Sequence, residues 1–191
     1  MYKYINNISD IRHFIIDNYL DNKKVAIDAT LGNGHDTDYL SSKFQRVYAF
    51  DIQKRPCEAY ISKGKENVKI INDSHHKLKD YVKEPVDCIV YNLGYLPGGD
   101  KNITTLYETS LLSIKIGLEL LEYGGIMAIC IYKGHNEGKK EETCILSYVK
   151  NLPKNEFGVM EHSYLNRDNN APTLIIIEKN NVKNIKRLIR N

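Results

Sequence analysis

Short apolar runs and helix-like segments alternate along most of this chain. The runs are short and rich in Val and Ile, as buried strands are. They occupy residues 24–29, 47–51, 68–71, 86–91 and 126–132. Segments with helix-like patterns lie at about 8–20, 55–65, 104–121 and 141–151. Another follows the glycine-rich turn after the first run and ends at about Lys43. This alternation is typical of a parallel sheet whose connections are helices.

The alternation stops near the C-terminus. Two strand-like runs, 157–164 and 173–178, follow each other with no helix between them, which predicts an antiparallel hairpin. The glycine pair Gly124-Gly125 is expected to end the helix at 104–121. We therefore predict an α/β fold: a Rossmann-like, doubly wound and mostly parallel sheet of seven strands with an antiparallel edge hairpin. A length of 191 residues suits a single domain spanning 1–191.

Composition excludes several classes of protein. No apolar run approaches the roughly 18–20 residues that span a bilayer, and the N-terminus lacks the apolar stretch of a signal peptide. We therefore expect a cytoplasmic protein without a membrane partner. The four cysteines form no C-x-x-C pair, so neither a metal site nor a disulfide framework is expected. A net charge of +3 permits a nucleic-acid partner without requiring one.

The strongest chemical signal directly follows the first strand, in the segment Asp28-Ala-Thr-Leu-Gly-Asn-Gly-His-Asp-Thr37. Gly32 and Gly34 allow a tight turn and a close approach of the backbone to a ligand. A pyrophosphate-binding turn would carry a third glycine where Thr37 stands, and the acid Asp28 would repel a pyrophosphate. An acid at this place suits a cationic ligand, such as the ammonium and sulfonium groups of S-adenosylmethionine.

Polar residues also end the next three strands. Asp51 ends the second strand, where folds of this kind place a carboxylate that binds ribose hydroxyls. The segment 73–75 (Asp-Ser-His) follows the third strand, and Asn92 ends the fourth. Each has a plain alternative, because Asp28 and Asp51 could cap a turn or helix and Asn92 could stabilise a loop. Together they predict a ligand site at the carboxyl edge of the sheet.

These stretches carry a resemblance to a known family. Further matching stretches are 49–53 (Ala-Phe-Asp-Ile-Gln), 92–101 (Asn-Leu-Gly-Tyr-Leu-Pro-Gly-Gly-Asp-Lys), 132–135 (Tyr-Lys-Gly-His) with Gly138, and 169–172 (Asn-Asn-Ala-Pro). The chain resembles the class I methyltransferases and, more narrowly, a small bacterial family long described as "putative rRNA methylases" and now assigned to the tRNA wobble uridine. Members of that family methylate the amine of 5-aminomethyluridine, often 2-thiolated, to the 5-methylaminomethyl form.

The resemblance implies roles for individual residues, with S-adenosylmethionine as cofactor. The residues implied to hold the cofactor are Asp28, Gly32, Asn33, Gly34, Asp36, Thr37, Asp51, Gln53, Asp73, Ser74, His75, Asn92 and Gly94. Those implied to contact the substrate are Tyr95, Lys101 and Asn169, with residues 95–101 forming a lid. The candidates for removing a proton from the amine are Asp100, Tyr132 and His135. The sequence departs from the family pattern at His76, where an acid is expected, and at Ala171, where a proline is expected.

Several alternatives stay open at this point. His135 could orient a loop instead of moving a proton, and Tyr95 could pack its loop instead of stacking on uracil. The basic tail 182–191 could dock as an amphipathic helix or face RNA. The implied partner is a tRNA anticodon stem-loop, and a homodimer is plausible. Other functions are methylation of rRNA or a small amine, nicotinamide- or flavin-dependent oxidation, and non-catalytic RNA binding with a decayed pocket.

Overall fold

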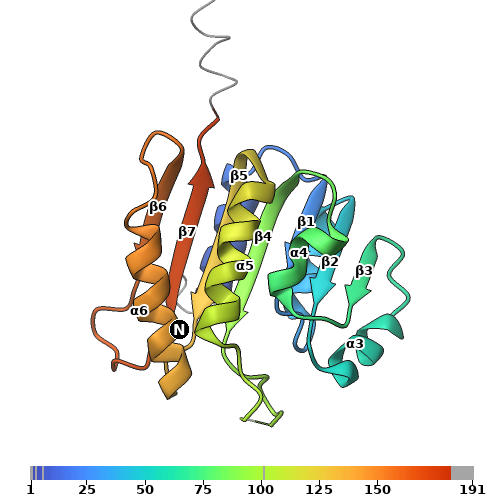
Figure 1. Ribbon diagram of the computed structural model, residues 1–191, viewed down its shortest axis with the longest axis horizontal. Coiled ribbons are helices and arrows are strands. Elements are labelled where there is room, and N and C mark those ends of the chain that lie inside the picture. The colour runs from blue at the N-terminus through green and yellow to red at the C-terminus, as the bar shows by residue number, and fades with distance from the viewer. Residues whose placement is uncertain (1, 3, 6, 101, 182–191) are drawn as a thin grey trace, which may run out of the picture.

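The computed structural model describes residues 2, 4–5, 7–100 and 102–181. Its seven strands form one sheet, in the order β3-β2-β1-β4-β5-β7-β6 (Figure 1). The strands are β1 (Val25–Asp28), β2 (Arg46–Phe50), β3 (Val68–Ile71), β4 (Val86–Leu93), β5 (Leu121–Ile131), β6 (Phe157–His162) and β7 (Thr173–Lys179). The helices are α1 (Ile8–Tyr19), α2 (His35–Lys43), α3 (Lys54–Ile61), α4 (Leu78–Tyr81), α5 (Tyr107–Leu120) and α6 (Asn136–Val149), with a 3-10 turn η1 (His75–Lys77).

The first five strands pair in parallel and the last two in antiparallel. β1 pairs with both β2 and β4, β2 with β3, and β4 with β5. β7 runs antiparallel to β5, and β6 antiparallel to β7. The predicted doubly wound, mostly parallel sheet of seven strands with an antiparallel edge pair is therefore confirmed. Because β7 is inserted between β5 and β6, β6 is the only strand of the antiparallel pair at an edge of the sheet, and β3 forms the opposite edge.

The two faces of the sheet carry different side chains. Alternate strand residues such as Ile27, Ile89 and Met127 pack with the cluster that includes α5 and α6, which cross in front of the sheet in Figure 1. The intervening residues, such as Ala26 and Cys88, pack with α1 and α2 on the other face. Strands buried on both faces explain the continuous apolar runs in the sequence. No helix in the described ranges has the length and apolar character needed to cross a bilayer.

Several predicted boundaries were wrong; the helix predicted at 55–65, for example, ends at Ile61. α6 begins at Asn136, five residues before the predicted start, because His135 caps it by accepting a hydrogen bond from the Gly138 amide at 3.0 Å. Gly124-Gly125 lies within β5 and does not end α5: the strand begins directly after the helix and shifts register against β4. α5 itself starts at Tyr107, three residues later than predicted.

Gly138 permits the close approach of α6 to the end of β5. A Cβ atom at this position would overlap the carbonyl oxygen of Tyr132 and lie 3.0 Å from Lys133 Cα. We expect Gly138→Ala to lower the free energy of unfolding by about 1–3 kcal/mol, measured by urea titration, because backbone atoms must move. The control is Gly158→Ala, since nothing lies within 4 Å of a Cβ there. Equal stability of the two variants would contradict this account of Gly138.

Candidate functional site

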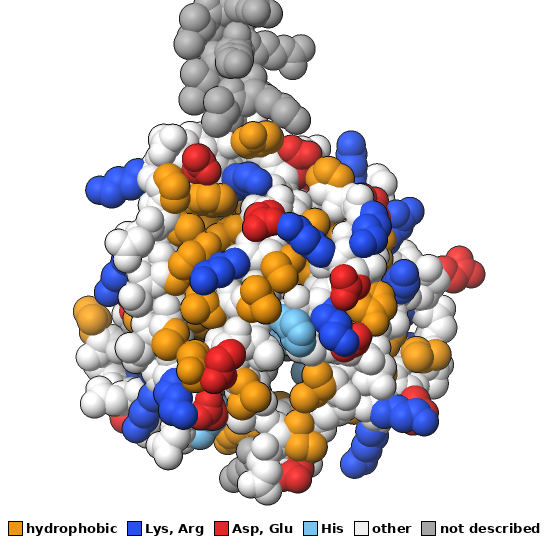
Figure 2. All heavy atoms as spheres, viewed as in Figure 1, with side chains coloured by type: hydrophobic (Ala, Val, Ile, Leu, Met, Phe, Trp, Pro, Cys, Tyr) orange, Lys and Arg blue, Asp and Glu red, His pale blue; other side chains and the backbone are white. Residues whose placement is uncertain are grey.

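A cavity of about 940 Å³ opens at the carboxyl edge of the sheet. Its walls come from the loops after β1, β2, β3, β4 and β5, together with the N-terminal part of α1. Figure 2 shows the surface hollowed near the lower end of the view, where the loop after β4 hangs in Figure 1. The predicted residues that line it are Gly32, Asn33, Gly34, Asp36, Asp51, Gln53, Asp73, Ser74, His75, Asn92, Gly94, Tyr95, Tyr132 and His135.

The turn after β1 forms one wall and is held by both neighbouring strands. Gly32 and Gly34 have φ values of +50° and +80°, which favour glycine. A Cβ atom on Gly34 would lie 2.5 Å from the ring of Tyr60, so no larger residue fits there. The Leu31 amide donates to the carbonyl of Phe50 at 2.8 Å. The result is a rigid, open backbone cradle facing the cavity.

Asp51 stands beside this cradle, at the end of β2. Its two carboxylate oxygens accept hydrogen bonds from the backbone amides of Gly32 at 3.0 Å and Gln53 at 2.8 Å. Burial raises the pKa of Asp51, and these two hydrogen bonds partly offset that rise. Each oxygen keeps a further lone pair. The carboxylate is therefore fixed in place and can still accept two hydroxyl groups of a diol.

Asp28 and Thr37 lie beneath the cavity and do not line it. Both are fully buried, and the Thr37 hydroxyl donates to Asp28 at 2.6 Å. The other carboxylate oxygen accepts from the Thr30 amide at 3.1 Å. Burial, followed by the negative charge of Asp36, raises the pKa of Asp28. Asp28 thus braces the turn, and the first motif presents Asp36 to the cavity instead.

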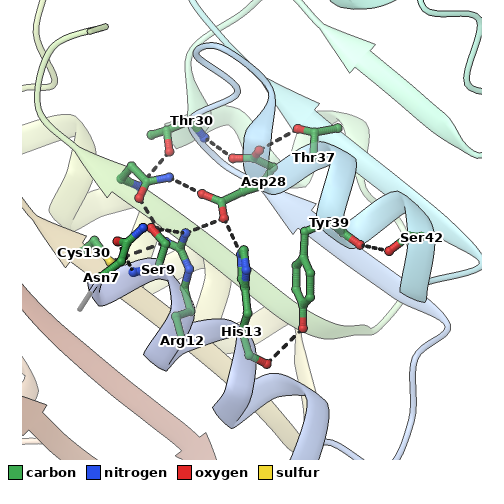
Figure 3. A network of polar contacts seen from close by, with 12 residues as sticks. Asn7, Ser9, Arg12, His13, Asp28, Thr30, Thr37, Tyr39, Ser42 and Cys130 are labelled. Carbon is green, nitrogen blue, oxygen red and sulfur yellow. Dashed lines mark hydrogen bonds and ion pairs between the residues drawn. The ribbon is translucent and has the colours of Figure 1, made fainter. Parts of the chain in front are cut away.

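Asp36 joins a buried polar network that sequence reasoning missed (Figure 3). Arg12, on α1, forms an ion pair with Asp36, and His13 Nε2 lies 2.8 Å from the same carboxylate oxygen. Asn92 Nδ2 donates to the other oxygen at 2.6 Å. One signal in the sequence was available: Arg12 occupies the apolar face of its helix, four residues after Ile8. A charged residue on the buried face of a helix usually has a partner.

His75 lies in η1 against the wall of the cavity. It is 7% exposed, its ring meets Tyr91 edge-on at 5.9 Å, and its Nδ1 has no hydrogen-bond partner among the described residues. Burial, with a smaller contribution from His76, lowers the pKa of His75 to about 4. The ring is therefore neutral at pH 7. His76, the departure from the family pattern, places its Nδ1 2.7 Å from Ser74 Oγ.

The loop after β4 folds over the cavity. Tyr95 pairs with Thr104 in an isolated bridge, and its ring lies 5.6 Å from that of His135. Asp100 turns away, accepting from the Asn102 backbone at 2.8 Å, and does not line the cavity. Lys101 and the tail 182–191 lie outside the described residues. Asn169 does not line the cavity, whereas its neighbour Asn170 does.

The two proton-transfer candidates that line the cavity are donors in this arrangement. His135 Nδ1 accepts the Gly138 amide, so the neutral ring carries its proton on Nε2, which lies 3.5 Å from Thr104 Oγ1. Burial raises the pKa of Tyr132, which keeps its phenol protonated at neutral pH. Neither group therefore offers a free acceptor for a proton.

The depressed pKa of His75 makes a prediction about stability. Between pH 6.5, the ordinary pKa of histidine, and about pH 4, this side chain binds a proton in the unfolded chain but not in the folded chain. The free energy of unfolding therefore falls as the pH falls through this range. Wild type should lose on the order of 1–3 kcal/mol more than His75→Gln between about pH 7 and about pH 4, measured by urea unfolding. His162→Gln, on the edge strand β6, serves as the control and should follow wild type. Parallel curves for wild type and His75→Gln would refute the assignment.

Comparison with known proteins places this chain in a family. Residues 47–178 match the family described as "Putative rRNA methylase". The chloroplastic tRNA (mnm(5)s(2)U34)-methyltransferase of Arabidopsis thaliana is 33% identical over 189 residues, covering 90% of this chain and 69% of that protein.

Two solved structures are also similar. One is a Streptococcus mutans protein described as a "putative methyltransferase" in complex with SAH: 39% identity, TM-score 0.83, and coverage of 94% of this chain and 99% of that one. The other is an rRNA methylase from Streptococcus thermophilus: 32% identity, TM-score 0.76, and coverage of 93% and 99%. The chain therefore belongs to the "Putative rRNA methylase" family, and it is a methyltransferase.

Proposed function

We propose that this protein uses S-adenosylmethionine to methylate the amine of 5-aminomethyluridine, with or without 2-thiolation, at the wobble position of a tRNA. The observation that carries the proposal is the relation to the Arabidopsis tRNA (mnm(5)s(2)U34)-methyltransferase, which spans 90% of the chain. The bound SAH of the Streptococcus mutans structure supports the choice of cofactor. The product is the 5-methylaminomethyl form.

The residues around the cavity fit this cofactor. Gly32 and Gly34 line the cavity with backbone that carries no side chain, and Asp51 can accept the two ribose hydroxyls. His75 Nδ1, buried and without a partner among the described residues, suits the polar edge of adenine, with Gln53 and Ser74 nearby in the lining. Asn33 and Asp36 are the residues that we assign to the methionine end.

The substrate half of the cavity is assigned to the loops after β4 and β5. When bound, S-adenosylmethionine supplies a methyl carbon attached to a sulfonium, which a neutral amine can take up in line. The ammonium of the substrate would first release a proton to solvent; its nitrogen would then form the new bond while the carbon–sulfur bond breaks, with the electron pair staying on sulfur and the positive charge passing to nitrogen. Tyr132 and His135 present O–H and N–H donors, so they orient the uridine by hydrogen bonds. Alignment in the cavity supplies much of the rate.

A second candidate function is methylation of rRNA or a small amine, which the family description and the Streptococcus thermophilus protein's name favour. Oxidation with a nicotinamide or flavin is disfavoured, since Thr37 replaces the third glycine of such turns and is buried against Asp28. A tRNA anticodon stem-loop as partner, a homodimer and an RNA contact by residues 182–191 remain predictions. So does a cytoplasmic location, since the Arabidopsis relative is chloroplastic.

Nucleoside analysis tests the substrate directly. tRNA from cells that lack this protein is digested and its wobble uridine is identified by mass spectrometry. We expect accumulated 5-aminomethyluridine that gains one methyl group when purified protein and S-adenosylmethionine are added. rRNA from the same cells is the comparison. An unchanged tRNA profile, together with a methyl group missing from rRNA, would replace the tRNA assignment with the second candidate.

Asp51 tests the cofactor assignment. Asp51→Ala removes the acceptor of the ribose hydroxyls, so we expect S-adenosylhomocysteine to bind about 10-fold more weakly or worse, measured by calorimetry. Asp38→Ala is the matched control, because Asp38 is also a carboxylate on this side of the sheet but bonds Tyr60 and Lys63 away from the cavity. Unchanged affinity in Asp51→Ala would show that Asp51 only braces the turn at Gly32.

A further inference from the structure

Arg12 is a buried cation directly behind the cavity wall. Its side chain is 0% exposed, although it belongs to the first helix of the chain. One terminal nitrogen pairs with Asp36, and the other donates to Asn92 Oδ1 at 3.0 Å and to Cys130 Sγ at 3.4 Å. Arg12 itself does not line the cavity, whereas Asp36 and Asn92 do. It touches the site through these two residues and through Ser9, another lining residue, whose Oγ lies 3.5 Å from the nitrogen that pairs with Asp36.

Stability alone does not account for this arginine. Taking a guanidinium and a carboxylate out of water costs free energy. A protein in which apolar residues of similar volume replace such a buried ion pair is often at least as stable. Arg12 Nε adds to the cost, because it is buried without a partner among the described residues. The neighbouring positions on the same helix face, Ile8 and Ile16, pack in the apolar cluster of α1 and α2. An apolar side chain would suit this position as a packing residue.

We propose that Arg12 is a positioning residue for cofactor binding: it keeps Asp36 ionised and fixes the amide of Asn92 beneath the methionine end of S-adenosylmethionine. The inference rests on the proposed function, which assigns Asp36 to that end. Asn92 is held from both sides, since Nδ2 donates to Asp36 and Oδ1 accepts from Arg12. This arrangement permits only one orientation of the amide.

The groups around Asp36 show why the cation is needed. Those facing it from the packed elements are Arg12 and His13 on α1, Asp28 on β1, Asn92 on β4, and Cys130 and Tyr132 from β5 and the residue after it. Burial opposes ionisation of Asp36, but the His13 hydrogen bond, the Arg12 charge and the Asn92 hydrogen bond outweigh it and hold its pKa well below the usual range. Without Arg12, the two buried acids Asp36 and Asp28 compete for a proton.

The test measures binding of S-adenosylhomocysteine by calorimetry from about pH 5.5 to about pH 8. In Arg12→Met, loss of the neighbouring cation raises the pKa of Asp36, so its ionised fraction falls as the pH falls, and only the ionised form receives the ligand's ammonium group. Affinity should therefore rise with pH, by up to about 10-fold per pH unit, and fall at least about 10-fold below wild type at the acid end. Arg12→Lys, which keeps the charge, should restore most of the affinity and flatten the pH dependence.

Controls separate this role from others. Arg46→Met removes an arginine–carboxylate pair far from the cavity, with Glu84, and should bind as wild type does. Repeating the series in a His13→Gln background removes the imidazole that contacts Asp36, and the effect of Arg12→Met should persist there. Arg12→Gln, which keeps hydrogen-bond donors but no charge, is the second neutral variant and should behave as Arg12→Met does.

Each outcome decides the question. A pH-dependent loss that Arg12→Lys rescues supports the proposal. A loss of affinity that is equal at every pH, or affinities like those of wild type, would overturn the proposal. Neutral variants that stay unfolded even with excess S-adenosylhomocysteine would also overturn it, because Arg12 would then be purely structural. Failure of the wild-type protein to bind S-adenosylhomocysteine would instead overturn the proposed cofactor. Binding by wild type therefore tests the cofactor, and binding by the variants tests the role of Arg12.

Discussion

The parallel pairing of β1 with both β2 and β4 is the constraint on which the rest of the site depends. It brings the carboxyl ends of three strands to one edge, and the chain after β1 is then tied to both neighbours. The Ala29 amide donates to Val90 at 2.9 Å, and the Asn92 amide donates to the Thr30 hydroxyl at 2.7 Å. These bonds hold the turn open, so that its backbone faces the cavity and not the core.

The cavity built on this edge has two unlike halves. One half is ionic and rigid, since buried carboxylates of the first motif are held by an arginine, a threonine and an asparagine from different elements. The other half consists of tyrosine and histidine side chains carried by the loops after β4 and β5. A fixed polar half suits a cofactor common to many reactions, and loops suit a particular substrate. The proposed division between S-adenosylmethionine and uridine follows this difference.

Local pattern predicted most of the elements, and its errors have physical causes. Gly124-Gly125 was predicted to end a helix, because glycine is common at helix ends, but it lies inside β5, at the register shift between the pairs that Leu121 and Ile126 make with β4. The start of α6 was missed because residues 134–138 contain two glycines. The cap from His135 and the close backbone contact at Gly138 make that segment helical. Both contacts are made in three dimensions, and no local propensity encodes them.

The sequence by itself determined the order of strands and helices, the glycine turn after the first strand and the polar residues at four strand ends. Those features depend on side-chain periodicity and backbone conformation, which are local. Tertiary structure decided which acid meets the cavity: Asp28 lies beneath the turn and bonds Thr37, whereas Asp36, though largely buried, lines the cavity and is held by Arg12. That choice depends on α1 packing across β4 and β5, because the charge of a buried group is set by neighbours distant in the chain.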